Sequence, residues 1–275
     1  MADRKTAFIT GAASGIGLAT ARRFAAGGWW VGGADLNRAG LAALRAELGA
    51  GNCEVWELDV TDKAAYDAVI RQVAAETGGG LDLLFNNAGI GITGFMDEIP
   101  IEQSMQIIQV NLIGVVNGIY AALPLLRQAA NSLCFSTSSS AATYGAPNLA
   151  IYAATKFAVK GLTEALAVEF SRFGVRAGDV LPGLIDTPIL EAPRYVNGAP
   201  VETEGRTIGT GAPNEGPFRL LPAAEVAEAV WNAYHGDRMH WYVPPEIEDI
   251  DKAKVQSPEA MRDARIAMMR RAAAP

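Results

Sequence analysis

Short apolar runs alternate with segments of helical periodicity along the first 180 residues of the chain. Repeated strand–helix units of this kind call for a parallel sheet covered by helices on both faces. Strands are predicted at Thr6–Thr10, Trp29–Ala34, Cys53–Leu58, Leu81–Phe85, Ser132–Thr137 and Val175–Leu181. Helices are predicted at about 15–27, 38–48, 62–77, 101–128 and 152–173. The pattern therefore predicts one doubly wound α/β domain with a parallel sheet of about seven strands.

Two later regions interrupt this rhythm. Residues 184–222 are rich in proline and glycine, which favours a long loop that acts as a lid, binds substrate or is locally disordered. A helix near 223–235 and a short strand near 240–243 follow, and Ser257-Pro258 predicts the start of a last helix. We expect one domain over 1–245 that includes the loop, and a tail over 246–275. The tail could cover the site, dock on another subunit or be a frayed terminus.

Charge and cysteine content narrow the classes of partner. The formal net charge is −7 and the basic residues are scattered, which argues against nucleic acid or a membrane surface as the main partner. The two cysteines form no CxxC pair, no signal-peptide pattern opens the chain, and no run of about 18 apolar residues occurs. A cytoplasmic location is expected. His235 and His240 have no third ligand at metal-like spacing, so we expect no metal site.

The stretch TGAASGIG, Thr10–Gly17, lies between the first predicted strand and the first helix. Its glycines would let the backbone turn sharply and approach a pyrophosphate, which the amides of the helix N-terminus would bind. A tight turn without a ligand is the structural alternative. The position between strand and helix favours nucleotide binding.

Asp35 ends the second predicted strand, where an acid can hydrogen-bond the ribose hydroxyls of a dinucleotide. Its carboxylate would repel a 2′-phosphate, and Thr10–Gly17 contains no Arg or Lys to attract one. Arg38 is close, but its position in a helix favours a solvated side chain. We therefore expect NAD, with NADP less favoured.

Tyr152 and Lys156 are spaced i, i+4 on a predicted helix and so would share one face. Tyrosine is a poor base at neutral pH, but a nearby cation favours the phenolate. A surface helix pair is the structural alternative. Upstream, the hydroxyl run Ser136–Ser140 ends the fifth strand, where ligands bind in open α/β sheets.

At this point the sequence resembles the short-chain dehydrogenase/reductase family, in its short form with TGxxxGxG and YxxxK motifs. The resemblance rests on Thr10–Gly17, Asp59-Val60, Asn86-Asn87-Ala88-Gly89, Asn111, Tyr152-Ala-Ala-Thr-Lys156, Pro182-Gly183 and Thr187. It implies a Rossmann fold and an oxidoreductase acting by hydride transfer. Members of this kind are commonly tetramers, so a homotetramer or homodimer is implied.

The family pattern places a serine thirteen residues before the tyrosine, which here is Ser139. The resemblance therefore implies the catalytic set Ser139, Tyr152, Lys156 and Asn111, with Asn111 distorting its helix and holding a water near Lys156. Ser138 is expected to position the strand end, Ser140 could face the pocket, and Ser136 and Thr137 are interpreted as structural. The expected cofactor contacts are Gly11, Ser14, Gly15, Ile16, Gly17, Asp35, Leu36, Asp59, Val60, Asn87, Ala88, Gly89, Tyr152, Lys156, Pro182, Ile185 and Thr187. Asp59 could instead cap the next helix.

The expected substrate contacts are Ser139, Ala141, Tyr144, Phe95 and Leu184, a mainly apolar set. The sequence thus predicts an NAD(H)-dependent enzyme that interconverts a secondary alcohol and a ketone of hydrophobic or aromatic character. An NADP(H)-preferring carbonyl reductase is an alternative, as is a cofactor-binding scaffold or sensor without turnover. An extended sugar-nucleotide epimerase would need a longer substrate domain, and an enoyl reductase would have a wider Tyr–Lys spacing.

Overall fold

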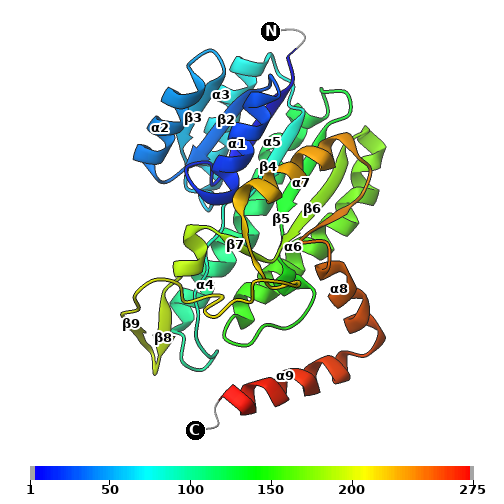
Figure 1. The fold of residues 1–275 in the computed structure, drawn as a ribbon. Coiled ribbons are helices and arrows are strands. Elements are labelled where there is room, and N and C mark those ends of the chain that lie inside the picture. The colour runs from blue at the N-terminus through cyan, green and yellow to red at the C-terminus, as the bar shows by residue number, and fades with distance from the viewer. Residues whose placement is uncertain (1–3, 273–275) are drawn as a thin grey trace.

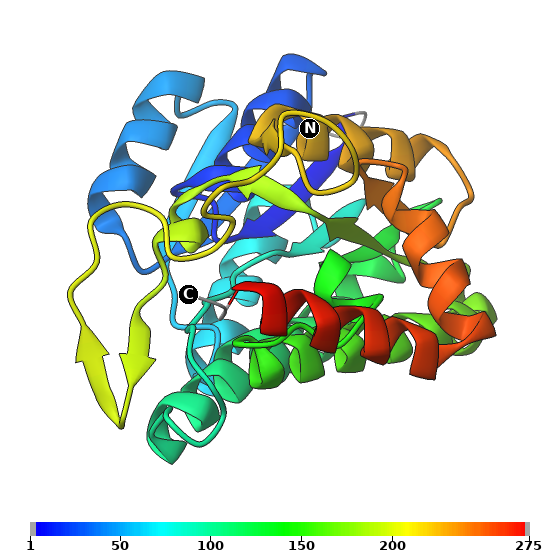
Figure 2. The same cartoon turned by 60° about the horizontal axis from the view of Figure 1, so that its bottom comes forward.

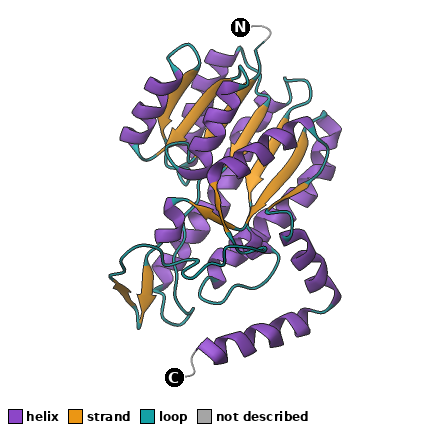
Figure 3. Cartoon of the chain, viewed as in Figure 1, coloured by secondary structure: helices purple, strands orange, loops and turns teal. Residues whose placement is uncertain are grey.

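The computed structural model describes residues 4–272. Seven parallel strands form the central sheet in the order β11-β6-β5-β4-β1-β2-β3 (Figures 1 and 3). The strands are β1 Thr6–Thr10, β2 Trp30–Asp35, β3 Cys53–Glu57, β4 Leu83–Asn86, β5 Leu133–Thr137, β6 Arg176–Pro182 and β11 His240–Val243. The order reverses between β1 and β4, which is the point where open α/β sheets bind ligands. The predicted doubly wound fold is confirmed.

Helices cover both faces of this sheet. They are α1 Gly15–Ala26, α2 Arg38–Leu48, α3 Lys63–Thr77, α4 Ile101–Ile108, α5 Gly114–Leu126, α6 Ala150–Glu169 and α7 Ala223–His235. One core joins α1, α2 and α7 to one face, and a second joins α3, α5 and α6 to the other. Along β1, Ala7 and Ile9 enter the first core while Phe8 enters the second. Strands buried on both faces need such continuous apolar runs, which is why the sequence pattern located them.

The helix predicted over 101–128 is interrupted. A π-helical turn at Gln109–Ile113 separates α4 from α5, and Asn111 is buried inside it. The stretch Ile101–Leu126 contains an 18-residue window that, at a mean hydropathy of 1.5, would suit a membrane span by length and composition. Half of this window is buried, however, and α5 packs against β4, β5 and α3. This packing is that of a core helix in a layered α/β domain.

Residues 184–222 are more ordered than the predicted loop. Two short strands, β7 Leu184–Asp186 and β10 Leu220–Pro222, pair in parallel, and β8 Arg194–Val196 forms a hairpin with β9 Ala199–Val201. Asn197-Gly198 turns this hairpin with positive φ at both residues, as a type I′ hairpin turn requires. The hairpin projects from the body of the domain in both views (Figures 1 and 2). The prediction of an irregular loop was therefore wrong in part.

The tail beyond residue 246 forms α8 Ile247–Gln256 and α9 Pro258–Ala272. Asp251 of α8 pairs with Lys160 of α6 and accepts a hydrogen bond from the Tyr242 hydroxyl at 2.8 Å. These contacts dock α8 on the domain. In Figure 1, α9 runs below the body of the domain. The helix that Ser257-Pro258 predicted is thus present, and the division of the chain at residue 246 stays a prediction.

Candidate active site

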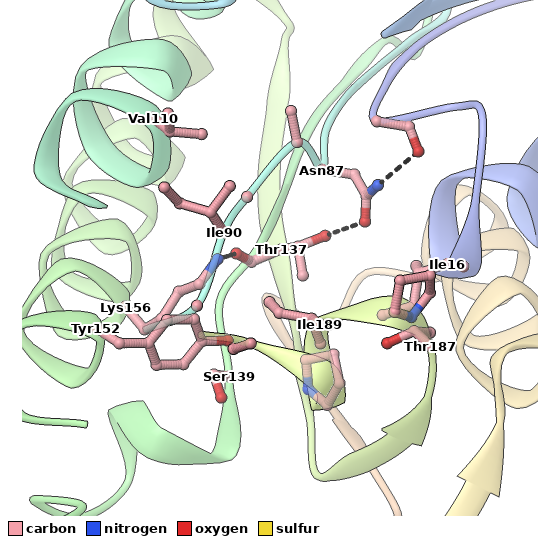
Figure 4. Close-up of a pocket in the computed structure, with 18 of the residues that line it drawn as sticks. Ile16, Asn87, Ile90, Val110, Thr137, Ser139, Tyr152, Lys156, Thr187 and Ile189 are labelled. Atoms are coloured by element: carbon pink, nitrogen blue, oxygen red, sulfur yellow. Dashed lines mark hydrogen bonds between the residues drawn. The ribbon is translucent and has the colours of Figure 1, made fainter. Parts of the chain in front are cut away.

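A cavity of about 830 Å³ opens at the carboxyl ends of the central strands (Figure 4). Its lining comes from the first strand–helix turn, the ends of β2 to β6, the start of α6 and residues 182–193 of the loop region. Parallel strands bring their carboxyl ends to one edge, so residues far apart in sequence meet there. This volume lies within the range of small-molecule and cofactor sites.

The glycine turn at one end of the cavity has no room for side chains. Gly11 and Gly15 have φ of +67° and +51°. A Cβ on Gly17 would lie 2.0 Å from the Gly11 carbonyl oxygen, so this glycine allows the helix to start against the turn. Within residues 4–272 the Ser14 side chain makes no capping hydrogen bond to α1, and the first turn of α1 carries no acidic residue. Its first amides therefore remain available to an anion, and the turn fits a pyrophosphate.

Acidic residues at the ends of β2 and β3 form the rim beside this turn. The Asp35 carboxylate accepts hydrogen bonds from the amides of Ala13 at 3.1 Å and Asn37 at 2.9 Å, which fixes its position. Asp59 accepts from the amide and hydroxyl of Thr61 at 2.9 and 2.8 Å. The alternative role of Asp59 as a helix cap was wrong, because Asp62 caps α3 through the amide of Ala65.

Asn87 joins the ends of three strands at the wall of the cavity, and Figure 4 shows its hydrogen bond with Thr137. Its side-chain amide donates to the carbonyl of Thr10 at 3.0 Å and accepts from the hydroxyl of Thr137 at 3.0 Å. Its backbone amide donates to the Thr10 hydroxyl at 3.0 Å. The ends of β1, β4 and β5 are thereby locked, which shapes the cleft between the glycine turn and the hydroxyl run.

Tyr152, Lys156 and Ser139 converge at the other end (Figure 4). The Lys156 ammonium donates to the carbonyl of Thr137 at 2.8 Å and lies 5.5 Å from the centre of the Tyr152 ring. Ser139 accepts a hydrogen bond from the Ala141 amide at 3.1 Å, and its side chain lies near the Tyr152 phenol in Figure 4. Ser138 instead donates to the Lys156 carbonyl at 2.9 Å, which joins the end of β5 to α6. Ser139 is thus the serine next to the phenol.

Burial dominates the titration of this pair. It raises the pKa of Tyr152, against the hydrogen bond with Ser139, which lowers it. Burial also lowers the pKa of Lys156 to about 8, against the charge of Asp179, which raises it. At neutral pH the lysine is therefore mostly a cation and the tyrosine a neutral phenol. A neutral phenol beside a cation is suited to donate a proton to a ligand oxygen.

Asn111 does not line the cavity but hydrogen-bonds to the backbone of Ile90, which does. Its side chain accepts from the Ile90 amide at 2.8 Å and donates to the Ile90 carbonyl at 3.0 Å. A Cβ on Gly89 would lie 3.2 Å from the Asn111 Oδ1 and 3.6 Å from the Lys156 Nζ. The expected distortion of the helix is present as the π-helical turn. The water expected beside Lys156 stays a prediction.

Most of the residues expected at the site do line the cavity. They are Gly11, Ser14, Gly15, Ile16, Asp35, Leu36, Asp59, Val60, Asn87, Ala88, Gly89, Ser139, Ala141, Tyr144, Tyr152, Lys156, Pro182, Leu184, Ile185 and Thr187. Gly17 and Asn111 lie behind the lining, as described above. Phe95 lies outside it, with 46% of its surface exposed, so the structure does not bring it to the other substrate candidates.

Sequence reasoning missed several residues of the site. Thr137, interpreted as structural, contributes its carbonyl to Lys156 and its hydroxyl to Asn87. Ile90, Ile92, Ile189 and Ile208 add apolar wall that no motif marks. Thr137 could have been found from its place in a hydroxyl run at a strand end. Ile90 and Ile92 could have been found because they directly follow the Asn86–Gly89 motif, whereas the places of Ile189 and Ile208 depend on how residues 184–222 fold back.

A glycine turn at the switch point and a Ser–Tyr–Lys group across the cavity define a dinucleotide-dependent oxidoreductase. The family model for short chain dehydrogenases matches residues 5–195. The chain is 40% identical over 194 residues, covering 69% of its length and 77% of the relative, to a 2,5-dichloro-2,5-cyclohexadiene-1,4-diol dehydrogenase of Sphingobium indicum. This chain belongs to the short-chain dehydrogenase/reductase family. It is an oxidoreductase that acts on CH–OH groups and uses NAD or NADP.

Solved structures show the same fold. A short chain dehydrogenase/reductase of Burkholderia phymatum in complex with NAD matches with a TM-score of 0.81 at 28% identity, covering 94% of this chain and 95% of the other. An alcohol dehydrogenase of Thermococcus sibiricus complexed with 5-hydroxy-NADP matches with a TM-score of 0.71 at 26% identity, covering 87% and 95%. These neighbours bind one cofactor or the other, so the likeness alone leaves the choice between them open.

Proposed function

We propose that the protein is an NAD(H)-dependent dehydrogenase/reductase that interconverts a secondary alcohol and a ketone of hydrophobic or aromatic character. The observation that carries this proposal is the convergence of Ser139, Tyr152 and Lys156 at one end of a cavity whose other end is the glycine turn. The catalytic roles of these residues and the preference for NAD follow from the chemistry of the residues around them.

In the proposed reaction Tyr152 transfers the proton and Ser139 stabilises the substrate oxygen. In reduction, Tyr152 donates its phenolic proton to the carbonyl oxygen, while Ser139 donates a hydrogen bond to the same oxygen as charge develops there. In oxidation, Tyr152 takes the hydroxyl proton as a phenolate, which the Lys156 cation stabilises. The nicotinamide, when bound, supplies or accepts the hydride. Lys156 is held for this role by the Thr137 carbonyl and by the anchor from Ser138.

The rim of the glycine turn supports NAD over NADP. The Asp35 carboxyl group is fixed there by the amides of Ala13 and Asn37. Among the residues of 4–272 that line the cavity, Lys156 is the only Lys or Arg. Arg38, the nearest basic residue in sequence, pairs with Glu57 at 2.6 Å. A 2′-phosphate would therefore meet a carboxylate without a free cation to offset it, whereas a ribose hydroxyl could donate to that carboxylate.

The walls beyond Ser139 support an apolar substrate. They include Ile92, Ala141, Tyr144, Leu184, Ile189 and Ile208. Among the described residues that line the cavity, the only cation for a substrate carboxylate or phosphate is Lys156, whose ammonium already donates to the Thr137 carbonyl. A ring-bearing or branched alcohol would bury its carbon skeleton against these side chains. The cyclic diol in the name of the Sphingobium indicum relative is of this chemical kind.

A substrate panel tests the proposed function. Purified protein is assayed with secondary alcohols and ketones of increasing apolar size, with NAD(H) and NADP(H), by the absorbance of the reduced nicotinamide. We expect turnover with NAD(H), and loss of at least about a thousandfold of it in Tyr152→Phe with cofactor binding nearly unchanged. Unchanged turnover in Tyr152→Phe would refute the mechanism, and a wild type that prefers NADP(H) would refute the role of Asp35.

We also infer a homotetramer or homodimer formed through the long helices. Tyr120 on α5 and Val168 on α6 expose 72% and 74% of their surface, although both are large apolar residues on helices that otherwise pack on the sheet. Burial of such residues between copies would stabilise an oligomer. Light scattering after size exclusion measures this, and a monomer at micromolar concentration would contradict it.

A further inference from the structure

A chain of charged side chains continues from the catalytic pair along the same face of α6. Tyr152, Lys156, Lys160 and Glu164 recur at intervals of four, which places them in one stripe of the helix. The stripe begins at the cavity and ends at Glu164, half of whose side chain is exposed. Titratable side chains aligned in this way interact electrostatically with their neighbours, from the buried site to the surface.

A buried acid lies beneath this stripe. Asp179 in β6 is fully buried, and its Oδ1 lies 2.6 Å from the Nδ1 of His240 in β11. The other carboxylate oxygen, Oδ2, has no hydrogen-bond partner within residues 4–272. The His240 Nε2 lies 3.4 Å from Glu164, so the imidazole connects the buried acid to the end of the stripe. A buried carboxylate with a free oxygen is costly unless other charges compensate it.

The position of Asp179 indicates which positive charge interacts with its carboxylate. Asp179 pairs in register with Ser136 of β5, and the next residue of β5, Thr137, holds the Lys156 ammonium by its carbonyl. The negative charge of Asp179 raises the pKa of Lys156, opposing the effect of burial. Asp179 thus lies on the strand next to the one whose Thr137 carbonyl holds the ammonium of Lys156 from α6.

Within residues 4–272 the other charged groups around Asp179 and His240 have ion-pair partners of their own, although the charge of Lys160 also lowers the pKa of Asp179 and that of His240. Lys160 pairs with Asp251 of α8, and Tyr242 of β11 donates to the same carboxylate. Glu248 of α8 pairs with Arg238 and Lys252. Burial raises the pKa of Asp179 to about 6, and the hydrogen bond from His240 opposes the rise. At neutral pH the acid is therefore largely ionised and able to act on Lys156.

We propose that Asp179, oriented by His240, is a positioning residue of the reaction that sustains the cationic form of Lys156 from beneath the site. This rests on the proposed function, in which the Lys156 cation stabilises the Tyr152 phenolate. Asp179 thereby sets the upper end of the pH range in which Tyr152 and Lys156 work together. Neither Asp179 nor His240 lines the cavity, so both act through Lys156 and not on the substrate.

A direct titration of Lys156 tests the proposal without turnover. The full-length protein is labelled at the lysine side-chain carbons, the Lys156 signal is assigned with Lys156→Arg, and its shift is followed with pH by NMR. We expect Asp179→Asn to increase the acid dissociation constant of Lys156 on the order of tenfold, because an opposite charge nearby is removed. The acid dissociation constant read from the alkaline limb of the kcat/KM profile should increase by the same factor, so that this limb moves to lower pH.

Asp251→Asn is the matched control, since it removes a carboxylate of α8 that pairs with Lys160 on the same stripe of α6 and not with Lys156. It should shift the Lys156 titration by less than about twofold. An unchanged Lys156 titration in Asp179→Asn, or an equal shift in Asp251→Asn, overturns the proposal. If Asp179→Asn does not fold, the wild type decides: the Lys156 signal should show a second inflection where His240 titrates, and its absence is likewise a refutation. A wild type without turnover would contradict the proposed function while leaving this titration readable.

Discussion

The two ends of the cavity are built from different parts of the chain. The glycine end, residues 10–17 with the ends of β2 to β4, offers mainly backbone groups that are fixed by the sheet. The loop end, residues 139–149 with 184–222, offers side chains carried by short elements and turns. Backbone geometry tolerates no added atom, whereas a side-chain wall can be trimmed. The glycine end should therefore fail abruptly on substitution, and the loop end should change by degrees.

The largest effect is expected from Gly17→Ala at the glycine end. The new methyl group would lie 2.0 Å from the Gly11 carbonyl oxygen and 2.8 Å from the Asn87 side chain, so the turn must move. We expect the free energy of unfolding to fall by about 3 kcal/mol. Cofactor affinity should fall as well, because the backbone amides of the turn would no longer all point toward the pyrophosphate. Denaturant unfolding and NAD titration measure both quantities.

Gly145→Ala is the control at the loop end. A Cβ there would meet nothing within 4 Å, and its φ is not positive. Its unfolding free energy should stay within about 0.5 kcal/mol of the wild type. Equal losses of unfolding free energy in the two variants would show that the glycine end is no less tolerant of substitution than the loop end.

The next effect separates two adjacent serines. Ser139→Ala removes a hydroxyl beside the Tyr152 phenol, and kcat should fall on the order of a hundredfold. Ser138→Ala removes a buried hydrogen bond to the Lys156 carbonyl, and should instead cost about 1 kcal/mol of stability with a smaller loss of kcat. Steady-state kinetics and thermal unfolding of both variants decide this. A greater loss of kcat in Ser138→Ala would reverse the assignment of the two serines.

The same contrast explains what could be predicted from the sequence. Strands buried on both faces and the glycine turn leave strong local patterns, so β1, β2 and the turn at Thr10–Gly17 were located before the structure. Tyr152 and Lys156 share a helix, and their spacing placed them on one face, but the nucleotide-binding motifs upstream were needed to favour a catalytic pair over a surface pair. Selecting Ser139 required the family resemblance, because five hydroxyl residues in a row look alike to propensity and periodicity.

Non-local placement marks where sequence reasoning failed. Phe95 was expected in the pocket, but nothing in its own segment determines where the loop region folds back across it. The pairing of β7 with β10 joins residues more than 30 positions apart and carries no periodic pattern. Asp179 and His240 meet only because β11 adds to β6 at the edge of the sheet. Each of these contacts depends on topology that a single sequence does not encode locally.

The smallest effect is expected from trimming the loop end. Ile208 lines the cavity beside Ile189, and its backbone amide is held by the Leu190 carbonyl at 3.0 Å, so the wall should survive loss of the side chain. Ile208→Ala should raise KM for an apolar alcohol about threefold to tenfold, because an apolar contact is lost, and leave KM for NAD unchanged. Val201→Ala, an exposed apolar residue of the same region outside the lining, should change neither constant. A rise in KM for NAD in Ile208→Ala would mean that the loop region also shapes the cofactor site, and the separation of the two ends would no longer hold.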